Sequence, residues 1–363
     1  MRRSTMKRKQ AMRITAVTAL AAACLSACAD DSGGSASAED VDARIAEINK
    51  SLEDNLYVKA AAESGEGENT CPKTLPEGET AEIVFSIEGL SHPFLVGQVD
   101  KAKAKAEEQG ATLTVISGDD DVNKQLNGVE TALGSNPDAL MMMPANTEGL
   151  GPILQQYEDA QIPYFFTQKG LLESNATNQV LAPYGEEGKI LGEYVVEHYA
   201  DSEEPVKVAL ISGITGDVSS VARTGSFERE LLESGNFEIV AEEPGEYRRE
   251  ESQTAMDSIL AAHPDVELVF GANDEGALGA LQAIKAAGKG GEIDVVGIDG
   301  QSDIFPAIES GDVLATVKHM QTAPYVVENI MKCLSGEAVP AFQVFPGDLV
   351  DAAAIEEGAE PAF

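Results

Sequence analysis

Residues His263–Gly300 contain the pattern that most limits how this chain can fold. Val266–Phe270 is a short β-branched and aromatic run, which is typical of a buried strand. Ala277–Ala287 is rich in helix formers, Gly288–Gly291 ends that helix, and Ile293–Ile298 resumes as a strand. Two strands joined by one crossover helix run parallel. The segment therefore predicts an α/β protein with helices on both faces of a parallel sheet.

Asn273 and Asp299 are expected at the carboxyl ends of these two strands, and Asp274 is expected to cap the helix between them. Open α/β sheets bind ligands at this edge. An Asp side chain accepts hydrogen bonds and an Asn side chain both donates and accepts, so the pair suits hydroxyl groups. Asx-turn and helix-cap roles are the structural alternatives for both residues.

Residues 1–27 have the composition of a lipoprotein signal peptide. The segment holds six of the 25 Lys and Arg residues, and its apolar run, Ile14–Ala23, is too short to span a bilayer. The sequence LSAC at 25–28 has the form of a bacterial lipobox. It predicts lipidation of Cys28 and a lipid anchor on the extracytoplasmic face of the cell membrane. An ordinary signal peptide with an incidental Cys is the alternative.

Charge and length bound the partners and the number of lobes. Removal of the leader leaves 19 Lys and Arg against 62 Asp and Glu, a net charge of −43. Such acidity argues against nucleic acid as a partner and predicts high solubility. About 336 residues would remain, more than one core usually supports, so two lobes are expected.

Strands and helices alternate along most of the chain from Ala81. Helices are expected in the gaps, for example at Phe94–Gln109, Glu187–Tyr199 and Ser220–Ser234. The predicted strands are Ala81–Ile87, Ala111–Ile116, Ala139–Met143, Ile162–Thr167, Val206–Ile211, Glu238–Val240, Val266–Phe270, Asp294–Ile298 and Val313–Val317.

The sequence HPDVELVFGANDEGALGAL, followed by VVGIDG, closely resembles the type I periplasmic sugar-binding proteins of the ribose-binding branch. These are the capture subunits of bacterial ABC importers. The resemblance covers about Ala81 to about Val344. It implies two lobes, each a doubly wound, mainly parallel sheet, joined by a hinge of three crossings. The crossings would fall near Ala182–Gly185, Lys318–Gln321 and Phe345–Gly347, with an N-terminal lobe of residues 81–182 plus 319–344 and a C-terminal lobe of 185–317 plus 348–363.

The resemblance also implies ligand-binding roles at strand ends. Phe94 and Tyr247 would stack on the faces of a sugar ring, and Arg223 would offer its fork of donors to vicinal hydroxyls. The alternatives are the apolar start of a helix for Phe94 and a solvated helix position for Arg223. The expected set is His92, Phe94, Gln168, Lys169, Arg223, Tyr247, Asn273, Asp299 and His319.

Three places depart from the ribose-binding pattern. Met143 stands where ribose binders usually have Asn, so it is expected to line the wall of the site rather than to hydrogen-bond the ligand. Gln168-Lys169 replaces Asp-Arg, which changes the donor and acceptor pattern. His319 replaces Gln, and a structural role is its alternative. A plain pentose is therefore in doubt, and a sugar, polyol or related polyhydroxy compound is expected.

Two of the four cysteines are left for a disulfide. Cys24 leaves with the leader and Cys28 would carry lipid, so Cys71 and Cys333 remain in an oxidising compartment and are expected to pair. The resemblance implies that both lie in the N-terminal lobe. Cys/His clusters are absent from the sequence, and neither a cofactor nor a metal is expected.

One acidic cluster has the spacing of a calcium loop, at Asp119, Asp121 and Asn123. Lys124, however, occupies the position that requires Gly. Asp121 is expected to cap a helix instead. The run Met141–Met143 is expected to be buried-strand material rather than a metal site.

Residues 28–80 are expected to form a tether, an amphipathic helix and a loop, with the folded body beginning near Ala81. Apolar residues recur at helical spacing from Val41 to Leu56, and such a short helix should dock on the lobes or on a partner. Ser64–Gly78 is rich in Gly, Pro and Glu, which predicts loop.

Capture of a solute for an ABC permease by a monomer that closes at its hinge is the primary functional hypothesis. An enzyme on the same fold has little support, because no G-x-G-x-x-G, G-x-S-x-G, P-loop or H-E-x-x-H motif is present. A receptor that reports to a membrane sensor shares every sequence feature with the transport protein. A transcription regulator is disfavoured, because a lipobox stands where a DNA-binding helix-turn-helix would be.

Overall fold

The computed structural model describes residues 37–53, 55, 57–58, 64–65, 67–76, 78–147, 149–171 and 174–363, which belong to one compact unit. The predicted leader, the lipobox at Cys28 and the Gly/Ser tether lie outside the described residues. Within the described ranges, no helix combines the length and the apolar character needed to cross a membrane.

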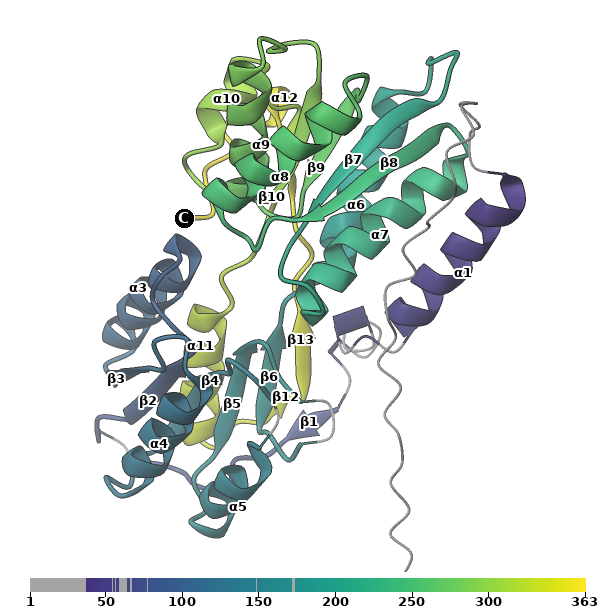
Figure 1. The fold of residues 1–363 in the computed structure, drawn as a ribbon. Coiled ribbons are helices and arrows are strands. Elements are labelled where there is room, and N and C mark those ends of the chain that lie inside the picture. Colours follow the sequence, from purple (N-terminus) through teal and green to yellow (C-terminus); the bar gives the residue numbers. More distant parts are fainter. Residues whose placement is uncertain are drawn as a thin grey trace, which may run out of the picture. The chain divides into compact units, whose positions relative to one another are not determined.

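The first of two six-stranded sheets, the N-lobe sheet, has the order β13-β6-β5-β4-β2-β3, and all its neighbours pair in parallel. Helices α3 (Pro93–Glu108) and α11 (Ala323–Leu334) cover one face, while α4 (Val122–Leu133) and α5 (Gly151–Asp159) cover the other (Figure 1). The strands are β2 (Glu82–Ile87), β3 (Thr112–Ser117), β4 (Ala139–Met143), β5 (Tyr164–Gln168), β6 (Asn178–Leu181) and β13 (Phe342–Val344).

The second, the C-lobe sheet, repeats this arrangement in the order β14-β11-β10-β9-β7-β8. Its pairs are parallel except for β14, which runs antiparallel to β11. Its strands are β7 (Val206–Ser212), β8 (Phe237–Pro244), β9 (Leu268–Gly271), β10 (Asp294–Asp299), β11 (Ala315–Lys318) and β14 (Leu349–Asp351). One face carries α8 (Arg249–Ala262), α9 (Asp274–Ala286), α10 (Phe305–Glu309) and α12 (Ala352–Glu356), and the other carries α6 (Tyr184–His198) and α7 (Val218–Ser234).

These two sheets confirm the predicted fold class. Each predicted strand is present; Ala139–Met143 has the predicted bounds, and the other strands have one or both ends shifted. The prediction Glu238–Val240, for example, is part of the longer β8. Strands β6, β13 and β14 were not predicted, because each has only three or four residues and none has a clear apolar alternation. The chain passes between the sheets after β6, after β11 and after β13.

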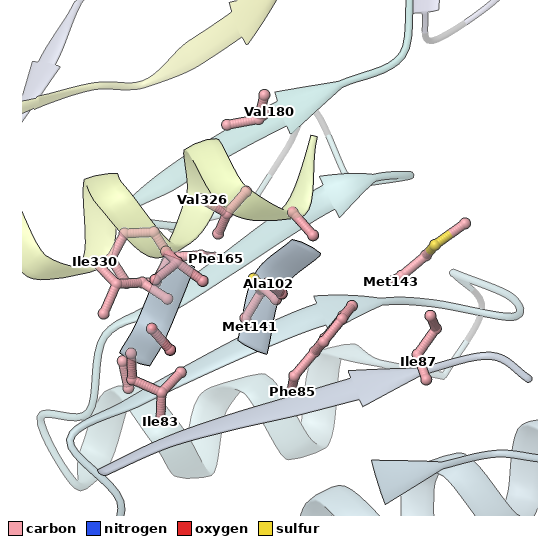
Figure 2. Close-up of a cluster of buried hydrophobic side chains, with 14 of the residues drawn as sticks. Ile83, Phe85, Ile87, Ala102, Met141, Met143, Phe165, Val180, Val326 and Ile330 are labelled. Carbon is pink, nitrogen blue, oxygen red and sulfur yellow. The ribbon is translucent and has the colours of Figure 1, made fainter. Parts of the chain in front are cut away.

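The N-lobe core shows why these strands form. Ile83, Phe85 and Ile87 of β2 point to the face covered by α3 and α11, whereas Val84 packs on the opposite face. Figure 2 shows the first set with Met141 and neighbouring apolar side chains. Both faces of the strand are buried, so its sequence is apolar at nearly every position from Ile83 to Ile87, as is typical of parallel sheets. The methionines of β4 are likewise buried and serve the core.

Packed structure begins before Ala81, in the region predicted to hold a tether, an amphipathic helix and a loop. Helix α1 (Ala38–Glu53) packs Ile48 and Leu52 against Leu232 of α7, and Arg44 Nε donates to Glu228 at 2.7 Å. Within the predicted loop, β1 (Glu68–Asn69) pairs antiparallel with β12 (Val339–Pro340). The expectation that Ser64–Gly78 is only loop is therefore wrong. A strand of two polar residues leaves no periodic signal in the sequence.

Cys71 and Cys333 form a disulfide, the pairing that the sequence predicts. Their Cα atoms lie 5.0 Å apart, and Cys333 is fully buried in the N-lobe core on α11. The bond ties the segment that precedes β2 to the N-lobe.

Candidate ligand-binding site

The N-cap of the helix after β9 is Asn273, not Asp274 as predicted. Asn273 has an extended backbone, and its side chain accepts a hydrogen bond from the Gly276 amide at 2.8 Å. Asp274 already belongs to the helix and turns its carboxylate toward β11, where the Thr316 hydroxyl lies 2.7 Å away. Asn273 also donates from Nδ2 to the Tyr247 backbone oxygen at 3.3 Å. Asn273 therefore has the helix-cap role, and this role fixes its side-chain amide at the carboxyl edge of the sheet.

Three of the proposed ligand residues have a backbone conformation that side chains other than Gly rarely adopt. Asp299 ends β10 with φ +139°, Gln168 ends the equivalent strand β5 with φ +62°, and Tyr247 has φ +58°. Such conformations cost free energy and gather at functional sites, where the surrounding structure holds them. At these three positions the strain lies at the carboxyl edges of the two sheets.

Arg223 of α7 is fixed by acceptors on three sides. Its Nε donates to Glu187 at 2.9 Å, one terminal nitrogen donates to the Ala272 backbone oxygen at 3.1 Å, and the other donates to Asp299 at 3.1 Å. Its guanidinium carbon lies 5.1 Å from the centre of the Tyr184 ring. A guanidinium has five N–H groups. These bonds use three, and one N–H on each terminal nitrogen has no partner among the described residues.

Glu187 was not predicted as a site residue, yet it joins the hinge to Arg223. Its carboxylate is fully buried at the start of α6 and lies 2.5 Å from His319 Nδ1. Burial works to raise the pKa of Glu187, but the charges of His319 and Arg223 outweigh it and hold the pKa below its usual value. The one sequence feature that could have indicated this role is its position, since Glu187 lies two residues beyond the predicted crossing at Ala182–Gly185.

His319 lies among aromatic rings. Its ring centre is 4.6 Å from that of Phe94 and 5.2 Å from that of Tyr184, on which it stacks. The side chain is buried at 2 % exposure. His319 is thus held by protein contacts, and it connects Phe94 of the N-lobe with Glu187 of α6.

Tyr247 lies beside the Gly213 backbone. A Cβ atom on Gly213 would approach the Tyr247 ring to 2.2 Å, so this loop has room for the ring only because residue 213 is Gly. The Tyr247 hydroxyl lies 3.0 Å from that of Ser219. Burial raises the pKa of Tyr247. These contacts fix the ring beside Gly213 and Ser219.

On the N-lobe side, His92 caps α3 by accepting from the Phe94 amide at 3.1 Å through Nδ1. Lys169 pairs with Glu88 at 2.9 Å. Burial would lower the pKa of Lys169, but the charge of Glu88 and their hydrogen bond raise it above its usual value. Gln168 donates from Nε2 to the Met320 backbone oxygen at 2.5 Å. Each of these three side chains is thus held by a contact with another part of the protein.

Several buried polar atoms in this region find no hydrogen-bond partner among the described residues. They are His92 Nε2, Gln168 Oε1 and both side-chain polar atoms of Gln321. Unpartnered buried polar groups are costly and need an explanation. Gln321 lies at the end of the predicted crossing Lys318–Gln321 and was not predicted as a site residue. Its side chain lies against Gly97 of α3.

Together these residues offer paired donors and acceptors next to aromatic rings. Arg223 donates, Asp299 accepts and Asn273 does both, while Phe94 and Tyr247 present ring surfaces. This combination suits a compact ligand with several hydroxyl groups. No cluster of three or more His, Cys, Asp or Glu suited to a metal occurs in the part of the chain that the structure describes.

The fold and this edge of the sheets define a bilobal solute-binding protein. Residues 83–335 match the model of the periplasmic binding protein domain family, and the chain belongs to that family. It is a type I periplasmic sugar-binding protein of the kind that serves ABC importers, located outside the cytoplasm, and not an enzyme.

Three relatives illustrate the match. The ribose import binding protein of Salmonella typhimurium is 30% identical over 269 residues, which cover 74% of this chain and 88% of that protein. A solute-binding protein of an ABC transporter from Mycobacterium smegmatis, solved with bound glycerol, has 28% identity and a TM-score of 0.71, covering 78% of this chain and 99% of that one. A second Mycobacterium smegmatis structure, in complex with β-D-fucofuranose, has 26% identity and a TM-score of 0.70, covering 76% and 92%.

Proposed function

We propose that this chain captures one neutral monosaccharide or polyol between its lobes and delivers it to the permease subunits of an ABC importer. The observation that carries the proposal is the fixed Arg223 with two uncommitted N–H groups, held between Glu187 and Asp299. A guanidinium fixed before binding loses little freedom when a ligand arrives, so its hydrogen bonds contribute fully to affinity.

The two lobes have different parts in this proposal. Arg223, Asn273 and Asp299 of the C-lobe hold hydroxyl groups, and Phe94 and Tyr247 stack on the faces of the ligand. His92, Gln168, Lys169 and His319, with Gln321 added, set which ligand is chosen. The unpartnered atoms of His92, Gln168 and Gln321 support this assignment, because a bound hydroxyl would satisfy them.

The relatives support a furanose or a small polyol as the ligand class. The three relatives are named for, or were solved with, ribose, β-D-fucofuranose and glycerol, all neutral and rich in hydroxyls. We further propose that the protein works as a monomer, closes at its hinge around the ligand, and is held at the membrane by lipid on Cys28.

A thermal-shift screen of pentoses, hexoses, alditols and inositols tests the capture function, because a ligand that binds only the native state raises its melting temperature. We expect one or a few members to raise the Tm and to be recovered unchanged after long incubation. Conversion of the bound sugar into a product would contradict the proposal, as would a screen in which no member of the panel raises the Tm.

A further inference from the structure

Residues 359–363, the latch segment, contact both lobes outside the three hinge crossings. On the C-lobe side the Ala362 amide donates to the Gly300 backbone oxygen at 2.7 Å, and the Ser302 amide donates to the Phe363 backbone oxygen at 2.9 Å. Gly300 directly follows Asp299, and the end marked C in Figure 1 lies in this region. The latch segment is thus attached to the loop that carries a proposed ligand residue.

On the N-lobe side the same two residues reach helix α3. The Phe363 ring lies 5.4 Å from the Phe94 ring at an interplanar angle of 67°, an edge-to-face pair, and it packs against the N-lobe core. Lys101, two turns further along α3, donates from Nζ to the Ala362 backbone oxygen. One short segment therefore bonds to the C-lobe through its backbone and to the N-lobe through a ring and an accepted hydrogen bond.

Phe94 connects these contacts to the site. Its ring also lies 4.6 Å from His319, so it stands between the hinge histidine and Phe363. Phe363 therefore extends the aromatic wall at the position where Phe94 was expected to stack on the ligand.

We propose that residues 359–363 act as a latch that holds the lobes together over the ligand, and that Phe363 forms part of the ligand's aromatic wall. The proposal rests on the proposed function in one respect, that the ligand is bound between the lobes. Separation of the lobes must break the Phe94–Phe363 and Lys101–Ala362 contacts or detach the segment from Gly300 and Ser302. The latch should therefore slow opening and so slow ligand release.

An alternative is that the latch segment itself occupies the place of the ligand. Its backbone is hydrogen-bonded to the loop after Asp299, whereas Arg223 donates to Glu187, Ala272 and Asp299. The segment therefore borders the polar groups and does not bind to them.

The first test needs no ligand. Spin labels on Glu107→Cys in α3 and Glu309→Cys in α10, both exposed positions, report the separation of the lobes. Phe363→Ala and Lys101→Met should shift the distance distribution of the ligand-free protein to longer values. Lys103→Met, an equal loss of charge at an exposed position on the same helix, should leave it unchanged. Identical distributions for all four proteins would overturn the latch.

The second test uses whichever of D-ribose, L-arabinose, D-galactose, sorbitol and myo-inositol raises the Tm most. Phe363→Ala should increase the dissociation rate by about three- to tenfold, as expected for loss of one aromatic pair. Tighter binding by Phe363→Ala would show that the segment competes with the ligand, and would overturn the proposal. If the unmodified protein binds no member of the panel, the proposed function fails, while the spin-label result still decides whether the latch exists.

Discussion

Arg223 shows how a single side chain is prepared for binding. Its hydrogen bonds to Glu187, Ala272 and Asp299 fix the plane of the guanidinium, and Tyr184 lies near one of its faces. Burial tends to lower the pKa of Arg223, but the charges of Glu187 and Asp299 raise it above its usual value. The arginine therefore stays charged and oriented without a ligand.

Asp274 carries a prediction about pH. Burial, with the charge of Asp299 nearby, raises the pKa of Asp274 to about 8, so the folded protein holds a proton there that the unfolded chain loses above about pH 4. Because the folded state binds more protons, this residue makes stability fall as pH rises from about 4 to about 8. Asp274→Asn should flatten that part of the stability profile, measured by urea unfolding at several pH values. A variant that loses stability at the same rate as the parent between pH 4 and 8 would contradict this assignment.

For single residues, the sequence predicted which polar residues lie at strand ends, but not which contacts hold their side chains in place. Asn273 and Asp299 follow strands of recognisable composition, so their place could be predicted. Glu187 and Gln321 lie in or beside crossings, where no periodic pattern marks burial. The positive φ of Gln168 and Tyr247 was also invisible, since a left-handed backbone is anticipated from sequence mainly at Gly and Asn.

Among the elements, helix α1 illustrates the difference between forming a helix and knowing where it packs. Its apolar spacing predicted an amphipathic helix, and α1 spans Ala38–Glu53. The sequence left open whether it docks on the lobes or on a partner. The ion pair between Arg44 and Glu228 joins residues 184 positions apart, and such pairs cannot be found without the fold.

The docking of α1 on α7 leads to a second prediction. Ile48→Asp places a charge against Leu232, so α1 should detach and its amides in residues 38–53 should exchange at least about tenfold faster, since full burial of an Ile side chain contributes roughly 1.5–3 kcal/mol. Hydrogen exchange with mass spectrometry measures this. Ala46→Asp, on the exposed side of the same helix, is the matched control and should exchange like the parent. Equal exchange in Ile48→Asp and Ala46→Asp would refute the docking.

The disulfide is a further prediction for this scale. It joins residues 262 apart in sequence, so its removal in Cys333→Ser should cost roughly 2–5 kcal/mol of unfolding free energy. Calorimetric melting of the Cys333→Ser and Cys71→Ser variants should give similar, lowered Tm values. Non-reduced mass spectrometry of the unmodified protein should find no free thiol at either position, and two free thiols there would show that the bond does not form.

For the whole molecule, the repeated strand order is what brings the site together. β5 and β10 hold equivalent places in their sheets, and they end in Gln168 and Asp299. The alternation of strands and helices predicted two parallel sheets, because that pattern depends on local composition. The lobe limits came from resemblance, since nothing local in residues such as Phe342–Val344 indicates which sheet they join.

Attachment to the membrane is a prediction for the whole molecule, since its evidence, the LSAC sequence, lies outside the described residues. In cell fractionation the unmodified protein should remain with the membrane, and Cys28→Ala should be released. One acyl chain anchors only marginally, so more than one is expected. Retention of Cys28→Ala in the membrane fraction would rule out this anchor.

The central claim is that Asp299 and Asn273, ordered around Arg223, bind the ligand's hydroxyl groups. Isothermal calorimetry with the strongest ligand from the thermal-shift screen tests it most directly. Asp299→Ala should leave ligand hydroxyls and one terminal N–H of Arg223 without their acceptor and cost about 1.5–3 kcal/mol, roughly ten- to hundredfold in affinity. Glu107→Ala, an exposed change on α3, should bind like the parent. Parent-like affinity in both Asp299→Ala and Asn273→Ala would contradict the account.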